Sequence, residues 1–228
     1  MTAIGVAAAF VLALRLDGRR AVRLLPRGSG DLRTAHGAGY ATLFLINAAA
    51  MGLSVYGPAV LQTLRGVSAL VAGYVVGAEA LCWTLTSLPV AGLTGVWPGR
   101  LIRLGVAMIL AGLLACALVF DRFGLIWPVA AAGLVGSGFG FCWAFISQRI
   151  LGDLVDDERA IGGAGIATVR LTGAAAGAAM AAAVANLAGF AGGFSVPAAR
   201  MAGIWVFAAA LPLAGLACIT AWRLGAPP

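Results

Sequence analysis

The stretch Leu125–Ser147 reads LIWPVAAAGLVGSGFGFCWAFIS and contains no charged residue. It is longer than the roughly 20 apolar residues that an α-helix needs to cross a bilayer core of about 30 Å. Five further stretches meet the same rule: Ala38–Leu61, Ser68–Leu93, Leu101–Phe120, Gly162–Ala188 and Met201–Trp222. The sequence therefore predicts an all-α, polytopic membrane protein in which residues 38–222 form a six-span bundle.

The amino-acid composition is also typical of a protein that lies in a lipid bilayer. The chain has 228 residues, of which 62% are hydrophobic and 10% are charged, against about 25% charged in soluble domains. All 15 basic residues are Arg, and their distribution explains most of the net charge of +7 without any nucleic-acid partner. Eleven lie in the segments on one side of the predicted spans, at positions 15, 19, 20, 23, 27, 33, 100, 103, 149, 159 and 223, and three on the other, Arg65, Arg122 and Arg200.

This bias predicts that the Arg-rich side, including the tail 223–228, faces the cytoplasm of a cell membrane. Residues 17–37 are then a basic cytoplasmic connector. Within residues 1–16, the apolar run Ala3–Leu14 is too short to span and is followed by its basic residues, which is the reverse of a signal peptide. We expect it to be the cytoplasmic part of a transmembrane helix that starts before Met1, with a re-entrant stub as the alternative.

Glycine accounts for 33 residues, and three pairs are spaced four apart: Gly73 and Gly77, Gly136 and Gly140, and Gly173 and Gly177. Residues four apart lie on one face of a helix, and small faces allow two membrane helices to approach closely. The pairs predict tight packing of the second, fourth and fifth spans.

Glu79 and Arg170 are the two charges set deep inside predicted spans. A charge at this depth costs roughly 2.5–3.5 kcal/mol on insertion scales, so such residues generally mark an ion or substrate pathway. Their predicted depths differ by only about 5–6 Å from the helical rise. Glu79 is the candidate for proton coupling, and Arg170 is either its ion-pair partner or a residue of a cavity; a static ion pair that fixes helix register is the alternative.

Four further residues are candidates for the wall of a substrate cavity: Asn47, Tyr56, Trp83 and Trp143. For the two tryptophans, packing or anchoring at the membrane interface is the more common use. Four cysteines lie inside the spans without a CxxC pattern, and we expect neither a metal site nor a cofactor. The acids of the polar segment Gln148–Ile161 lack the spacing of a calcium loop and favour the start of the following helix.

Several segments resemble the C-terminal half of major facilitator superfamily transporters, most of all the fourteen-span drug:proton antiporters. The residues that carry the resemblance are 56–73, which read YGPAVLQTLRGVSALVAG; the connector DGRRAVRLLP at 17–26; and RLTGAAAG at 170–177. Residues 92–105 are similar to the cytoplasmic loop motif of that family but lack its aspartate.

The resemblance implies one six-helix half of a transporter, in which two bundles rock around a central cavity. The expected function is proton-coupled export of drug-like or amphipathic small molecules, together with a missing or separate N-terminal half. Two alternatives stay open: a non-transporting membrane remnant or scaffold, and a membrane-embedded enzyme. The enzyme is disfavoured because the spans contain no histidine, paired carboxylates or Ser–Lys set.

Overall fold

The structure is a computed structural model that describes residues 5, 12, 16, 23–120, 124–193 and 195–225. The predicted partial helix at residues 1–16 therefore lies almost entirely outside the described residues, as do part of the connector and the last three residues of the tail.

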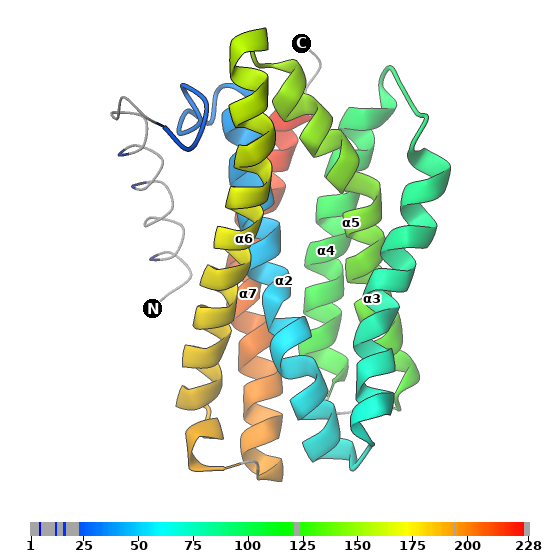
Figure 1. Ribbon diagram of the computed structural model, residues 1–228. Coiled ribbons are helices and arrows are strands. Elements are labelled where there is room, and N and C mark those ends of the chain that lie inside the picture. Colours follow the sequence, from blue (N-terminus) through cyan, green and yellow to red (C-terminus); the bar gives the residue numbers. More distant parts are fainter. Residues whose placement is uncertain are drawn as a thin grey trace.

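Six long helices make up the described part of the chain (Figure 1). They are α2 (Ala35–Arg65), α3 (Ala69–Val90), α4 (Trp97–Val119), α5 (Ile126–Gly152), α6 (Asp156–Leu187) and α7 (Val196–Leu224), with a short 3-10 helix, η1 (Phe190–Gly192), before α7. The described residues contain no strand, and each of the six helices is long and apolar enough to cross a membrane. The predicted all-α, six-span architecture is confirmed.

The helices begin and end where local side chains can satisfy their free backbone groups. The Thr34, Ser68 and Ser195 side chains each accept a hydrogen bond from a backbone N–H in the first turn of α2, α3 and α7. Gly66 ends α2 with a φ of 62°, a left-handed conformation that glycine adopts without strain.

One predicted boundary is wrong. The segment Gln148–Ile161 is polar, but α5 continues to Gly152 and α6 already begins at Asp156. Only three residues join the two helices, because a helix can extend past the apolar core into water. The acids Asp156, Asp157 and Glu158 do occupy the first turn of α6, where negative charge stabilises a helix.

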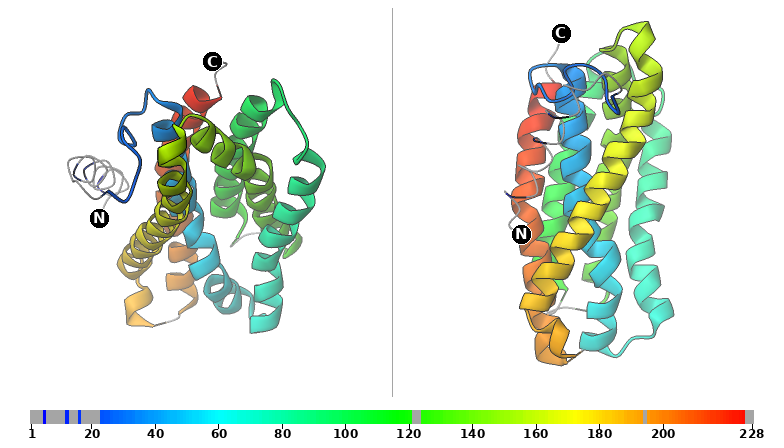
Figure 2. Two further views of the ribbon diagram at one scale, coloured as in Figure 1. Left: turned by 45° about the horizontal axis from the view of Figure 1, so that its top comes forward. Right: turned by 60° about the vertical axis from the view of Figure 1, so that its left-hand side comes forward.

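The helices form two groups of three. In one group α2 packs against α6 and α7, and in the other α5 packs against α3 and α4; α4 and α7 join the groups. Figures 1 and 2 show α3 and α6 on opposite sides of the bundle, with α2 and α5 between them. In the most apolar window of each helix, 61% of the residues of α2 and α5 are buried, against 11% in α3 and 28% in α6. Both α3 and α6 therefore present wide open faces.

Candidate functional site

Close contact between α3 and α5 positions the first part of the site. A Cβ at Gly136 would collide with the backbone of Glu79, and one at Gly140 would collide with Thr86 and the Trp83 carbonyl. The glycines thus let α5 lie directly against α3. This is the tight packing that the sequence predicted for this glycine pair.

The second close contact joins α2 and α6. A Cβ at Gly173 would meet the backbone of Phe44, and one at Gly177 would meet the backbone of Ala48. This pair also packs as predicted. By contrast, Gly73 and Gly77 have no atom within 4 Å of a built Cβ and lie on the open face of α3. For this pair, the prediction that it packs against another helix is wrong within the described chain.

An aromatic cluster lies where α3 meets α5. The Trp83 ring stacks on Phe139, with ring centroids 5.0 Å apart and planes inclined by 18°. Trp83 also contacts Trp143 at 5.7 Å, with the rings tilted by 54°. Phe139 is 3% exposed, whereas the two tryptophans are half-buried. The cluster therefore joins the core to the open face.

Arg170 reaches this cluster from α6. Its guanidinium carbon lies 6.0 Å from the centroid of the Trp143 ring, within cation–π range. The structure thus brings three predicted site residues, Trp83, Trp143 and Arg170, together from three different helices. We call these three residues and Phe139 the Arg–Trp cluster. Phe139 was not predicted, because one apolar residue within a continuous apolar run gives no signal.

The predicted ion pair between Glu79 and Arg170 is wrong. No salt bridge or hydrogen bond joins the Glu79 side chain to any other residue in the described part of the chain. The two charges have similar depths, but they belong to helices on opposite sides of the bundle (Figures 1 and 2). Glu79 instead lies on the stripe of α3 that faces α5, one helical turn from Trp83.

The other two cavity candidates lie elsewhere. Asn47 is half-buried on α2, and its Nδ2 donates to the Leu43 carbonyl at 2.7 Å, so its amide group is partly used within its own helix. The Tyr56 ring packs edge-on against Phe190 of η1, at a centroid distance of 5.9 Å. Tyr56 therefore packs between the far end of α2 and η1, and it does not belong to the Arg–Trp cluster.

The end of the bundle that carries the connector and the α5–α6 turn, which we call the Arg-rich end, holds a polar network. His36 Nδ1 lies 2.6 Å from Asp153 Oδ2, and His36 Nε2 lies 2.9 Å from the Arg27 carbonyl oxygen. Arg23 Nη2 pairs with Glu158 at 3.2 Å. The network ties the connector to α5 and α6. Sequence reasoning missed it because the partners are more than 100 positions apart.

This network lowers the pKa of the Asp153 carboxyl group. Partial burial acts to raise the pKa of its carboxyl group, but hydrogen bonds from the His36 backbone and ring, the charge on that ring and the Ala35 N–H outweigh burial and lower the pKa below its ordinary value. Each ring nitrogen of His36 faces an acceptor, Asp153 Oδ2 at Nδ1 and the Arg27 carbonyl oxygen at Nε2. A His36 ring that carries a hydrogen on each nitrogen therefore donates a hydrogen bond to each of them.

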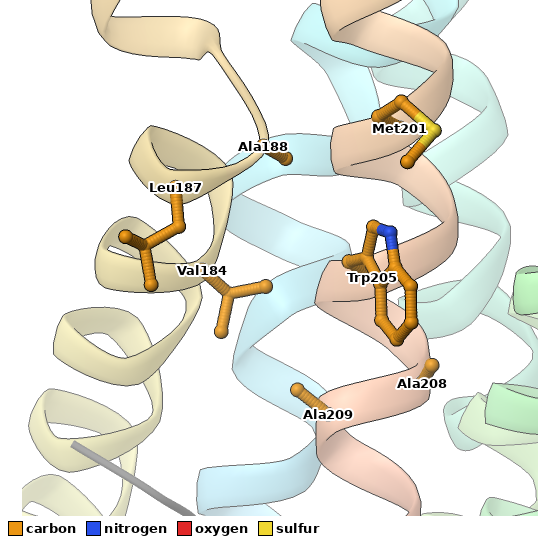
Figure 3. Close-up of a pocket in the computed structure, with 7 residues that line it drawn as sticks. All are labelled: Val184, Leu187, Ala188, Met201, Trp205, Ala208 and Ala209. Atoms are coloured by element: carbon orange, nitrogen blue, oxygen red, sulfur yellow. The ribbon is translucent and has the colours of Figure 1, made fainter.

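Two cavities lie outside the Arg–Trp cluster. One, of about 550 Å³, is apolar and opens between the far ends of α6 and α7, where Figure 3 shows Trp205 and Met201 beside Val184 and Leu187. The other, of about 380 Å³, lies at the Arg-rich end and is lined by Ala35, Gly95, Pro98, Phe145, Gln148, Arg149, Gly152 and Asp153.

The fold and these contacts define a multi-pass helical membrane protein. Comparison of the sequence with known protein families and with curated proteins gives no match.

Proposed function

We propose that this chain forms one six-helix unit of a proton-coupled transporter of the major facilitator type, which exports amphipathic small molecules. The observation that carries the proposal is the position of the Arg–Trp cluster. Arg170 lies eight residues after Gly162, where the apolar part of α6 begins, or about 12 Å into that part by the usual rise per residue. An exposed guanidinium at this depth is costly against lipid, whereas a polar cavity can solvate it.

The open face of α6 supports a second unit opposite this one. Its exposed residues beyond the acidic first turn are mostly small: Gly163, Ala164, Ala167, Thr168, Thr172, Ala175 and Ala179. The exposed faces of α4 and α7 instead carry large apolar side chains, such as Leu104, Leu118, Ile219 and Trp222, and the open face of α3 combines small residues with large apolar ones, such as Leu70, Tyr74 and Leu85. Small faces favour contact with other helices, and large apolar faces suit lipid.

Glu79 is the proposed proton carrier. Apart from the acids in the first turn of α6, it is the only acid in the six described helices. It lies near the middle of α3, and it has no cation beside it in the described chain. An intramembrane acid of this kind commonly belongs to a proton pathway. The proposed partner unit is a six-helix bundle, supplied by a separate chain or by a preceding part of the same protein. The proposed location is the cell membrane, with the Arg-rich end in the cytoplasm.

The test uses inside-out membrane vesicles from the native cells, which contain any partner unit. Cells with the wild-type gene, with Glu79→Gln at the same chromosomal position, or with the gene deleted supply the vesicles. A pH-sensitive dye reports an imposed gradient with an acidic lumen. We expect amphipathic compounds to release protons from wild-type vesicles only. Equal decay of the gradient in all three strains, across anionic, neutral and cationic compounds, would contradict the proposed function.

A further inference from the structure

Three Arg–Trp pairs occur in the described part of the chain, and one differs from the others. Arg103 lies 4.6 Å from the Trp222 ring centroid, and Arg100 lies 5.7 Å from that of Trp97. Both pairs are at helix ends on the Arg-rich side, where water and lipid head groups solvate a cation. Arg170 and Trp143 instead meet inside the predicted spans, away from the helix ends.

The guanidinium of Arg170 has unused donor capacity. It is exposed, and the described residues give it neither a hydrogen bond nor an ion pair. A guanidinium carries five N–H donors in a planar fork that matches a carboxylate. Contact with the face of Trp143 holds the group in place without occupying those donors.

The described residues do not provide an anion for this fork. Of the six acids that the structure describes, five lie in the connectors or at the start of α6, and the sixth, Glu79, lies on the α5-facing stripe of α3. The anion that completes the site must therefore come from outside the described chain.

The rings beside Arg170 indicate what that anion is attached to. Trp143, Trp83 and Phe139 give a continuous aromatic surface, with centroid spacings of 5.0 and 5.7 Å. Phe139 is buried behind the two half-buried indoles, so the surface is anchored in the core and its outer part is free for contact. The two accessible indoles can pack against an aromatic body, offset-stacked on one ring and edge-on to the other.

We propose that the Arg–Trp cluster binds an amphipathic anion, in which one carboxylate pairs with Arg170 and an aromatic body rests on Trp143 and Trp83. The inference rests on the proposed function, because it names the substrate class of the same site. It predicts a preference for an anion over a cation that has the same aromatic body.

Binding to the purified chain in detergent tests the inference without any need for transport. Pyreneacetate and pyrenemethylammonium share one aromatic body and differ in charge, and equilibrium dialysis measures their binding. We expect wild-type protein to bind pyreneacetate at least about tenfold more tightly than pyrenemethylammonium. A tenfold ratio of dissociation constants corresponds to one good charge-assisted hydrogen bond. Equal binding of the two probes, or tighter binding of the cation, overturns the proposal. This comparison requires no variant that must fold.

Variants then locate the site. Arg170→Gln should weaken pyreneacetate binding by about tenfold or more and leave pyrenemethylammonium unchanged, and Arg170→Lys should retain part of the preference as a point charge. Trp143→Leu should weaken both probes. Arg100→Gln is the matched control, since it removes an equivalent Arg–Trp pair at a helix end, and it should change neither. Anion binding that survives Arg170→Gln but falls in Arg100→Gln would also overturn the assignment.

The outcomes separate the inference from the proposed function. Selective anion binding without proton release in vesicles keeps the site and rejects the transporter. Proton release driven only by cations, together with equal binding of the two probes, keeps the transporter and rejects the anion.

Discussion

At the scale of single residues, the two deep charges have different surroundings. Arg170 has an aromatic partner and free donors, whereas Glu79 is packed against α5 without a counter-charge in the described chain. Similar depth in the membrane did not make them partners. The energetic consequence is that each should tolerate loss of the other.

A double-mutant cycle checks this independence. We expect the effects of Glu79→Gln and Arg170→Gln on the free energy of unfolding to add within about 0.5 kcal/mol, as they do for residues that share no contact. Chemical or thermal unfolding of the purified single and double variants gives the coupling energy. Coupling well above about 1 kcal/mol, with the double variant more stable than either single one, would restore the ion pair.

The Asp153 carboxyl group makes stability depend on pH. Because contact with His36 lowers its pKa in the folded state, its contribution is fully present above the ordinary Asp pKa of about 3.9 and is lost as the pH falls through the folded pKa. Asp153→Asn should therefore lower the melting temperature at pH 7, and the deficit should shrink toward pH 3. The exposed Asp157, changed to Asn, is the control and should show a smaller deficit at pH 7. Equal deficits for the two variants would contradict the role of the His36 contact.

At the scale of helices, glycine has two distinct uses in this bundle. Gly136 and Gly177 are where one helix backbone lies against another, while Gly77 faces open space. The same four-residue spacing therefore marks a helix contact within the chain on α5 and α6 but not on α3. What distinguishes them is which face of the helix the neighbouring helices occupy.

Alanine substitutions separate the two uses. Gly136→Ala places a methyl group against the Glu79 backbone and should destabilise the purified chain by about 1–3 kcal/mol, as overpacking does in other cores. Gly77→Ala meets no atom and should be neutral or stabilising by up to about 1 kcal/mol, because alanine favours the helix. Thermal unfolding in detergent measures both. A Gly77→Ala variant as unstable as Gly136→Ala would mean that the purified chain packs this face of α3.

At the scale of the whole molecule, the connectors alternate between two ends. The start of α2, the α3–α4 and α5–α6 turns and the end of α7 share the Arg-rich end, as Figure 1 shows. The Arg bias therefore acts on one physical surface of the bundle, and the connector is tied to that surface by Asp153 and Glu158.

Reporter fusions check the orientation in the membrane. Fusions after Pro228 and within residues 153–155 should report the cytoplasm, and a fusion at Gly192 should report the opposite side. A fusion at residues 153–155 is sharper than one elsewhere in 148–161, because only those three residues lie outside helices. An external signal at 153–155 would reverse the assignment.

The sequence alone determined the six spans, their approximate limits, the acidic start of α6 and the two glycine contacts on α5 and α6. These depend on distance along a helix axis, and residue number converts to that distance at about 1.5 Å per residue, against a bilayer of nearly constant thickness. Only the tertiary structure decided that Arg170 meets Trp143 rather than Glu79, that Gly77 faces open space, and that His36 binds Asp153. Those contacts depend on the order of the helices around the bundle and on the rotation of each helix about its axis. The depth of a residue in the membrane does not determine that order or that rotation, because two side chains at equal depth can face each other or point to opposite sides of the molecule.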